Sequence, residues 1–526
     1  MKRHVNLLWL VVLLLGWLFD FLFWKQSPGI NFAAYVLLCL AGGFLVLRLD
    51  QKRVAPGALP LIPLILYFAV MTFLRQEPLT LAISWMLALL LMAILVITFV
   101  DGDWLKYTLS EYVAGLLRLV GSMLVRPLFF NNEVHREQLE VGQPVRRTNV
   151  WPMLRGIVIA IPVLLVFGAL LASADVVFGS RLHQLIQLLR LENLPQYVFR
   201  LVYILAAAYA LAGVFLHASG HGRAGPRATS AARAPFAFLG FVEAAIVLGS
   251  VVILFAAFVL VQFQYFFGGQ VNIGVEGYTY SEYARRGFGE LLFVAFFSLL
   301  LILGLSSVTR RENEFQRKLF SAMGAVIVAL VTIILVSAYQ RLALYEAAYG
   351  FSRLRTYTNV LLVWVGVLLV AVIALEILRL ERGFAAAALI AALGFGITLS
   401  LLNVDGFIVR QNVDRAMRGE ALDTAYLVSL SADSVPVVAQ IYRMESYPLS
   451  IREAMGAILA CRVGLSADRS SGDWRSFEVS STQAAGAVAS LKTSLAGYQY
   501  VGGNWPAHVL APGGIGVYDC QGSRPD

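Results

Sequence analysis

The sequence predicts an all-α polytopic membrane bundle of about eleven transmembrane helices, followed by a small, mainly helical soluble domain. Of 526 residues, 59% are hydrophobic and 14% are charged, against about 25% charged residues in soluble chains. Apolar stretches long enough to span a bilayer recur from Leu7 to about Leu402 and then stop. The predicted spans are residues 6–24, 29–48, 58–74, 79–100, 151–173, 196–217, 237–264, 289–308, 319–340, 358–378 and 383–402.

These spans divide the chain into four parts. Residues 1–100 form an N-terminal four-helix membrane part, and residues 101–150 hold a cytoplasmic interfacial helix with a basic loop. Residues 151–402 form a seven-helix membrane core, and residues 403–526 form an extracytoplasmic helical domain. In the second part, residues 112–130 place leucines at helical spacing with two arginines among them. This pattern predicts a helix lying in the membrane interface, although a helix docked on the bundle fits equally well.

The distribution of basic residues predicts the orientation. If the N-terminus is cytoplasmic, cytoplasmic loops hold about twice as many Lys and Arg residues as the opposite loops, as the positive-inside rule requires. An odd number of spans then puts the C-terminal domain outside, and one miscounted helix would reverse that conclusion. On that side Cys461 and Cys520 could form a disulfide, whereas Cys39 lies within a span.

Two predicted extracytoplasmic loops, residues 268–290 and 341–357, are dense in Tyr, Arg and carboxylate side chains. Arginine binds carboxylates or phosphates through paired hydrogen bonds, and tyrosine adds stacking surface. We therefore expect an extracytoplasmic binding surface, against the alternative that these residues anchor the interface or tie the loops to each other or to the tail. The candidate residues are Tyr280, Glu282, Tyr283, Arg285, Arg286, Glu290, Arg341, Tyr345, Glu346, Tyr349, Arg353, Arg355, Asn403, Asp405, Asn412 and Arg415.

Few charges fall within the spans. Glu243, about a third of the way into its predicted helix, is the candidate for ion or proton coupling, because intramembrane carboxylates are costly and usually functional. Pairing with a neighbouring helix is the alternative reading.

The sequence lacks the motifs that are typical of several enzyme classes. The sequence has no phosphate-binding P-loop, no Gly-x-Ser-x-Gly nucleophile elbow and no His-Glu-x-x-His zinc motif. The six histidines form no metal-ligating set, so we expect no metal and no cofactor. The net charge of +9 lies mainly in short loops between spans, which argues against nucleic-acid binding. The expected partner is the lipid bilayer, with another envelope protein or an anionic small ligand as further candidates.

The densest motifs resemble a known family. They include Tyr-x-Glu-Tyr-Ala-Arg-Arg-Gly-Phe at 280–288, residues 341–350 and residues 430–436. Together with the candidate residues above, they resemble bacterial multi-pass membrane proteins catalogued as domain of unknown function four-one-seven-three, with a sister family four-one-five-three. The resemblance covers roughly residues 152–442. It implies a bacterial integral membrane protein of the inner membrane and no established activity.

Three functions remain open. The first is a non-enzymatic envelope sensor or scaffold, which the lack of catalytic motifs favours. The second is an ion-coupled transporter or flippase-like carrier of an anionic substrate, with Glu243 in the coupling role. The third is a membrane-embedded transferase acting on a lipid-linked substrate, with Glu282 or Glu346 as base and arginines holding phosphates.

Overall fold

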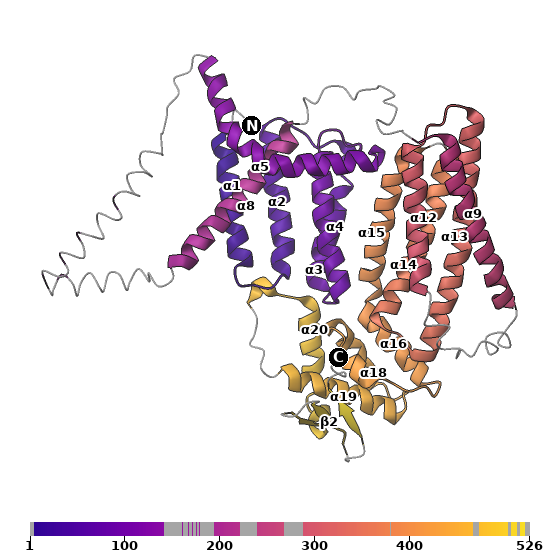
Figure 1. The fold of residues 1–526 in the computed structure, drawn as a ribbon. Helices are drawn as coiled ribbons and strands as arrows, with labels where there is room; N and C mark the ends of the chain where they lie inside the picture. Colours follow the sequence, from indigo (N-terminus) through magenta and orange to yellow (C-terminus); the bar gives the residue numbers. More distant parts are fainter. Residues whose placement is uncertain are drawn as a thin grey trace. The chain divides into compact units, whose positions relative to one another are not determined.

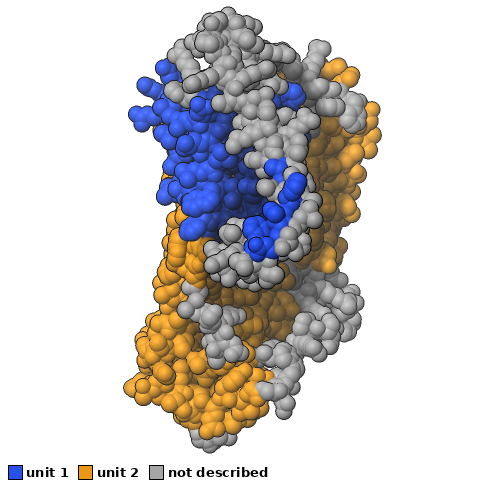
Figure 2. Space-filling model, turned by 90° about the vertical axis from the view of Figure 1, so that its left-hand side faces the viewer, with its two compact units in different colours: residues 1–25, 37–53, 115–222 blue, residues 26–36, 54–114, 223–526 orange. Residues whose placement is uncertain are grey.

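The computed structural model describes residues 5–140, 194–220, 239–267, 288–378, 380–466, 473–502, 507–512 and 516–520, with isolated residues between 160 and 178. Two compact units make up the chain (Figure 2). Unit 1 comprises residues 1–25, 37–53 and 115–222, and unit 2 comprises residues 26–36, 54–114 and 223–526.

The all-α polytopic bundle is confirmed. Eleven helices of the described residues are long and apolar enough to cross a membrane. Ten of them coincide with predicted spans, whereas the predicted span at 151–173 falls outside the described residues. The eleventh is the stretch 109–130, which by length and composition alone also qualifies as a span.

Unit 1 is built on helices α1 (Val5–Phe23) and α8 (Leu194–Gly220), with the later parts of α2 (Ile30–Leu49) and α5 (Leu109–Glu140). Helix α1 approaches α8 closely at Gly16, where a Cβ atom would lie 2.6 Å from the Ile204 carbonyl oxygen. The same two helices are joined by Asp20, which is 1% exposed and accepts a paired hydrogen bond from the Arg200 guanidinium.

Helix α5 contacts α8 within unit 1. The Ser122 hydroxyl and His217 Nδ1 lie 2.7 Å apart, and the Arg126 guanidinium donates to the Leu216 carbonyl at 2.7 Å. This is the contact expected of a helix docked on a neighbour, the alternative to the predicted interfacial helix.

Among the described membrane helices of unit 2, the four between residues 241 and 377 pack around apolar side chains such as Ile327, Val331, Leu342 and Leu369, all fully buried. Neighbours in sequence are mostly neighbours in space, as expected for helices joined by short connections. The membrane helices of unit 2 are α3 (Leu61–Leu74), α4 (Pro78–Ile97), α9 (Phe241–Phe267), α12 (Phe288–Val308), α13 (Glu314–Tyr349), α14 (Arg353–Ile377) and α15 (Phe384–Leu402).

The C-terminal domain of unit 2 is mainly helical, as predicted. Figure 1 shows its helices gathered at one end of α14 and α15. Side chains cap several of these helices: Asn403 accepts from Gly406 N–H, and Asp423 accepts from Tyr426 N–H. The elements are α16 (Val404–Ala416), α17 (Thr424–Val428), α18 (Val435–Arg443), α19 (Leu449–Ser466), α20 (Val479–Ala489) and the strands β1 (Gln499–Val501), β2 (His508–Leu510) and β3 (Val517–Asp519).

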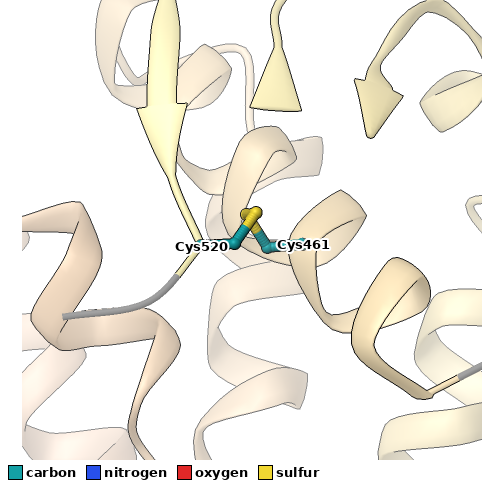
Figure 3. Close-up of a disulfide and its surroundings, with 2 residues drawn as sticks. All are labelled: Cys461 and Cys520. Carbon is teal, nitrogen blue, oxygen red and sulfur yellow. A yellow bond between two sulfur atoms is a disulfide. The ribbon is translucent and has the colours of Figure 1, made fainter. Parts of the chain in front are cut away.

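A three-stranded antiparallel sheet in the order β1-β2-β3 covers α19. A disulfide holds this arrangement: Cys461 of α19 is bonded to Cys520, just after β3, with an S–S distance of 2.01 Å (Figure 3). Both cysteines are buried, 0% and 1% exposed. The bond closes a loop of 59 residues and fixes the end of the chain on the helical core.

Removing the disulfide should destabilise the C-terminal domain. For a closed loop of 59 residues, the chain-entropy model gives a loss of roughly 4 kcal/mol in the free energy of unfolding. Cys520→Ser should therefore lower the thermal midpoint of the purified full chain, and reductant should lower the wild-type midpoint in the same way. Cys39→Ala, which removes the cysteine of α2 that is outside the disulfide, is the control. A Cys520→Ser protein with the wild-type midpoint would contradict the prediction.

Candidate functional site

The densest polar cluster of unit 2 lies where the C-terminal domain meets the ends of the membrane helices. We call it the junction and define it by the side chains of Glu77, Arg353, Tyr357, Asp405 and Asp433. Three of the five are nearly or fully buried carboxylates: Glu77 is 2% exposed, Asp405 0% and Asp433 3%. Buried carboxylates need charged or hydrogen-bonding partners, and each of them has several.

The centre of the junction is the ion pair between Arg353 and Asp405. Arg353 stands in the first turn of α14, and its Nε and Nη2 atoms donate to the two Asp405 oxygens at 2.8 and 2.6 Å. Asp405 stands in the first turn of α16, where the helix dipole favours a negative charge. The backbone N–H of Ser431 donates to the same carboxylate at 2.6 Å. One carboxylate thus holds α14, α16 and the segment before α18 together.

Tyrosine hydroxyls extend the pair on both sides. The backbone N–H of Arg353 donates to the Tyr426 hydroxyl at 2.8 Å, and burial raises the pKa of Tyr426. The Tyr357 hydroxyl donates to the Glu77 carboxylate. Glu77 is in turn the N-cap of α4, because its oxygens accept from the N–H groups of Leu79 and Thr80. The network therefore reaches the connection between α3 and α4.

Asp433 fixes that connection from the other side. Its Oδ2 accepts from the backbone N–H groups of Gln76 and Glu77 at 2.7 and 2.9 Å, and its Oδ1 accepts from the Ser480 hydroxyl of α20. Arg75 approaches the same carboxylate at 3.9 Å. Asp433 thus ties the connection between α3 and α4 to α20.

A second contact joins α16 to the connection between α13 and α14. The Asn412 carboxamide exchanges two 2.9 Å hydrogen bonds with the backbone of Phe351. The Arg415 guanidinium donates to the Ala347 and Ala348 carbonyls at 3.2 and 3.1 Å, and so satisfies carbonyls at the open end of α13. Gly350 permits this approach: it has φ +79°, and a Cβ there would lie 2.5 Å from Asn412 Oδ1.

The helix ends correct one prediction. Residues 341–357 were expected to form an extracytoplasmic loop, but they are the last turns of α13 and the first turns of α14, joined at residues 350–352. The hydropathy pattern did not predict these helical turns, because α13 and α14 continue beyond their apolar stretches. Within the helical turns, Glu346 is 5% exposed and accepts from the Asn359 carboxamide at 2.7 Å.

The other predicted site residues do not gather in one cluster. The Arg341 guanidinium donates to Gln262 of α9 at 3.0 Å, the Arg355 guanidinium lies 4.0 Å from the centre of the Tyr345 ring, and Tyr349 is 54% exposed. Glu290 is exposed in the first turn of α12. Asn403 caps α16 and donates to the Asp433 carbonyl at 3.2 Å. Five predicted residues lie outside the described residues, namely Tyr280, Glu282, Tyr283, Arg285 and Arg286.

Glu243 lies elsewhere than expected. The prediction put it about a third of the way into a span, but α9 begins at Phe241, so Glu243 is exposed in the first helical turn. A carboxylate at this position is stabilised by the N-terminal end of the helix. Among the described residues, no group of three His, Cys, Asp or Glu side chains could hold a metal ion.

The list of candidate site residues from the sequence lacks Glu77, Tyr357, Tyr426 and Arg462. Arg462 lies beneath the segment that carries Ser431: its Nη2 donates to the carbonyls of Leu430 and, at 3.3 Å, Val428. Burial lowers the pKa of Arg462 to about 10. Glu77 and Arg462 carry no recognisable motif. Tyr357 ends the stretch 341–357 that the sequence analysis singled out, Tyr426 lies within the region of resemblance, and Asp433 lies in the segment Leu430–Pro436.

Residues 62–441 match the model of a protein family described as Domain of unknown function (DUF4153). The chain belongs to this family. The sequence analysis named it only as the sister of the family that it resembled, domain four-one-seven-three, and its description assigns no activity. The DUF4153 match begins in α3 and ends in α18, so every residue of the junction falls within it. No curated protein and no solved structure matches the chain.

Breaking the central ion pair should destabilise the junction. Asp405→Ala leaves the Arg353 guanidinium and the Ser431 N–H without their acceptor, and the loss of one partner of a buried pair costs about 3–5 kcal/mol. Asp414→Ala is the matched control, because Asp414 is exposed on the same helix. Thermal unfolding of both full-length variants in detergent measures the difference, and equal midpoints would contradict the prediction.

Proposed function

We propose that this protein is an envelope sensor or scaffold of the bacterial inner membrane, without catalytic activity, whose extracytoplasmic C-terminal domain is docked on the membrane helices. The observation that carries the proposal is the pairing at the junction. Arg353, Asp405, Asn412 and Arg415, which sequence analysis assigned to a binding surface, contact one another or the backbone across the junction. Side chains engaged in this way fix the domain on the bundle.

The pairing argues against a transferase, and the position of Glu243 argues against an ion-coupled carrier. A transferase needs a base and phosphate-binding cations that can reach a substrate, whereas the Arg353 guanidinium is occupied by Asp405. An ion-coupled carrier needs a titratable group along its path, and Glu243 stands at a helix end.

The order of the helix ends supports an extracytoplasmic domain. The domain contacts the end of α3, where Ser480 donates to the Leu74 carbonyl at 2.8 Å. It also contacts the segment just before α2, where Ile30 N–H donates to the Phe477 carbonyl at 3.1 Å. If α1 crosses the membrane once, the N-terminus lies opposite the domain. A cytoplasmic N-terminus, as the basic loops favour, then puts the disulfide in an oxidising compartment.

The sides of the membrane on which the helices start and end support a total of eleven spans. Helix α4 starts beside the domain, since Glu77 belongs to the junction, and so ends on the opposite side. Helix α9 ends near the domain, because Gln262 accepts from Arg341 near the end of α13. An even number of crossings must therefore separate α4 from α9. Helix α8 supplies one, and one of the stretches 109–130 and 151–173 supplies the other.

Reporter fusions test this topology. Alkaline phosphatase, active only outside the cytoplasm, should be active when fused after Asp526 and inactive when fused after Asp101, which follows α4. A cytoplasmic fluorescent reporter should give the opposite pattern at the two positions. Phosphatase activity at Asp101 with none at Asp526 would reverse the orientation.

A sensor or scaffold must bind another molecule through its exposed domain. Photo-crosslinking amino acids placed in living cells at Leu449 and Val517, which are 67% and 63% exposed on the domain, should give discrete protein adducts. Leu354 of α14, 68% exposed, is the control and should give none of those bands. If Leu449 and Val517 give only bands that the Leu354 control also gives, the sensor or scaffold proposal fails.

A further inference from the structure

A cavity of about 710 Å³ lies beside the junction, between α13, α14, α15 and α16. This volume is in the range of pockets that hold small organic ligands. Its lining is divided. One end is polar, with Glu346, Asn359, Arg415 and Arg418, and the other end is apolar. The apolar lining includes Val360, Val363, Trp364, Val367 and Leu402.

The cavity runs along α14 from the helix end towards the middle of the bundle. From Thr356 to Val367, the helix rises about 16 Å at about 1.5 Å per residue, close to half of a hydrocarbon core of about 30 Å. Val363 and Val367 line the cavity and are also 56% and 49% exposed. The cavity is therefore open sideways on an apolar helix surface, at the depth of one lipid leaflet.

The polar end offers a carboxylate, Glu346, and one buried amide oxygen that lacks a donor in the described ranges, Asn359 Oδ1. Asn359 Nδ2 donates to Glu346 Oε1, and Asn359 Oδ1 is buried with no hydrogen-bond partner among the described residues. An unsatisfied buried oxygen costs free energy unless a donor reaches it. A carboxylate and an amide oxygen together fit an ammonium group, which has three N–H donors and a positive charge.

Cations lie at the same end. Arg418 lines the cavity, is exposed, and forms no ion pair within the described part of the chain. Arg415 also lines the cavity, but it pairs with Glu420 at 3.5 Å and caps α13. A guanidinium at the rim fits a phosphate.

We propose that this cavity binds a glycerophospholipid with a primary amine in its headgroup. The ammonium donates to Glu346 and Asn359, the phosphate faces Arg418, and one acyl chain lies along Val363 and Val367. The proposal concerns a different surface from the exposed domain positions of the sensor or scaffold and does not depend on that function.

Native mass spectrometry of the delipidated full chain tests this binding. Phosphatidylethanolamine should bind about tenfold more tightly than phosphatidylcholine, because the quaternary amine has no N–H to donate. Phosphatidylglycerol, which lacks an amine, should bind as weakly as phosphatidylcholine. Equal affinities for the three lipids would overturn the proposal. Soluble phosphoethanolamine should not displace the lipid at equal concentration, and displacement would identify a soluble ligand instead.

Two matched pairs of variants locate the site. Val363→Trp fills the cavity and should reduce phosphatidylethanolamine binding at least about tenfold. Val370→Trp changes the same residue type on the same helix, 60% exposed but outside the cavity, and should bind as wild type. Equal binding by the two variants would overturn the proposed site.

The second pair uses exposed arginines, so that folding is preserved. Arg418→Gln should weaken binding about two- to fivefold, the range for one exposed charge pair. Arg410→Gln removes an exposed arginine of α16 that does not line the cavity and should have no effect. If Arg418→Gln and Arg410→Gln bind equally, the phosphate does not face Arg418 and the proposed pose is wrong.

Discussion

The arrangement of unit 2 depends on one buried charge, the carboxylate of Asp405. It is fully buried, and its desolvation is offset only while the Arg353 guanidinium and the Ser431 N–H are both in place. Those donors come from the start of α14 and from the segment before α18. An alternative docking of the domain that displaced either one would leave a buried charge without its partners. The pair therefore adds less to net stability than to the choice of a single arrangement.

Membrane helices need this kind of constraint more than soluble ones do. Lipid is as apolar as leucine, so the hydrophobic effect does not select which apolar face of a helix meets its neighbour. At the junction, the selection is made by polar groups at the helix ends. Glu77 caps α4 and accepts from Tyr357 of α14, and Asp433 binds the backbone between α3 and α4. Helices distant in sequence are thereby aligned with the C-terminal domain.

Hydropathy predicted the spans because each apolar stretch is a local property of about twenty residues. It placed the ends less well, since α13 continues to Tyr349 and α9 begins only at Phe241. Arg353, Asp405, Asn412 and Arg415 were recognised from the sequence, and the alternative reading tied such residues to the tail, but it did not say which residue contacts which. Arg353 and Asp405 are 52 residues apart, and no local sequence pattern predicts that they are in contact.

The contact between Glu77 and Asp433 is even harder to predict from the sequence. The bond from Glu77 N–H to Asp433 joins residues 356 positions apart, and Glu77 lies in a short polar connection with no motif. From the sequence alone, a carboxylate in such a connection is expected to be exposed to solvent. Its burial follows only from the docking of α20 against α3 and of Asp433 against the connection after α3, which no local pattern encodes.

Arg415 connects the junction to the cavity. Its guanidinium caps the carbonyls of Ala347 and Ala348 and so holds α16 on the end of α13, and the same side chain lines the cavity. The arginines of the polar end, Arg415 and Arg418, therefore line the cavity only while α16 is docked. A ligand that binds only the docked arrangement stabilises it by RT ln(1 + [L]/Kd), where [L] is the free ligand concentration. By the same linkage, undocking of the domain must weaken binding of the ligand. A lipid bound in this cavity would couple the composition of one leaflet to the position of the C-terminal domain, which is the property that a membrane sensor requires.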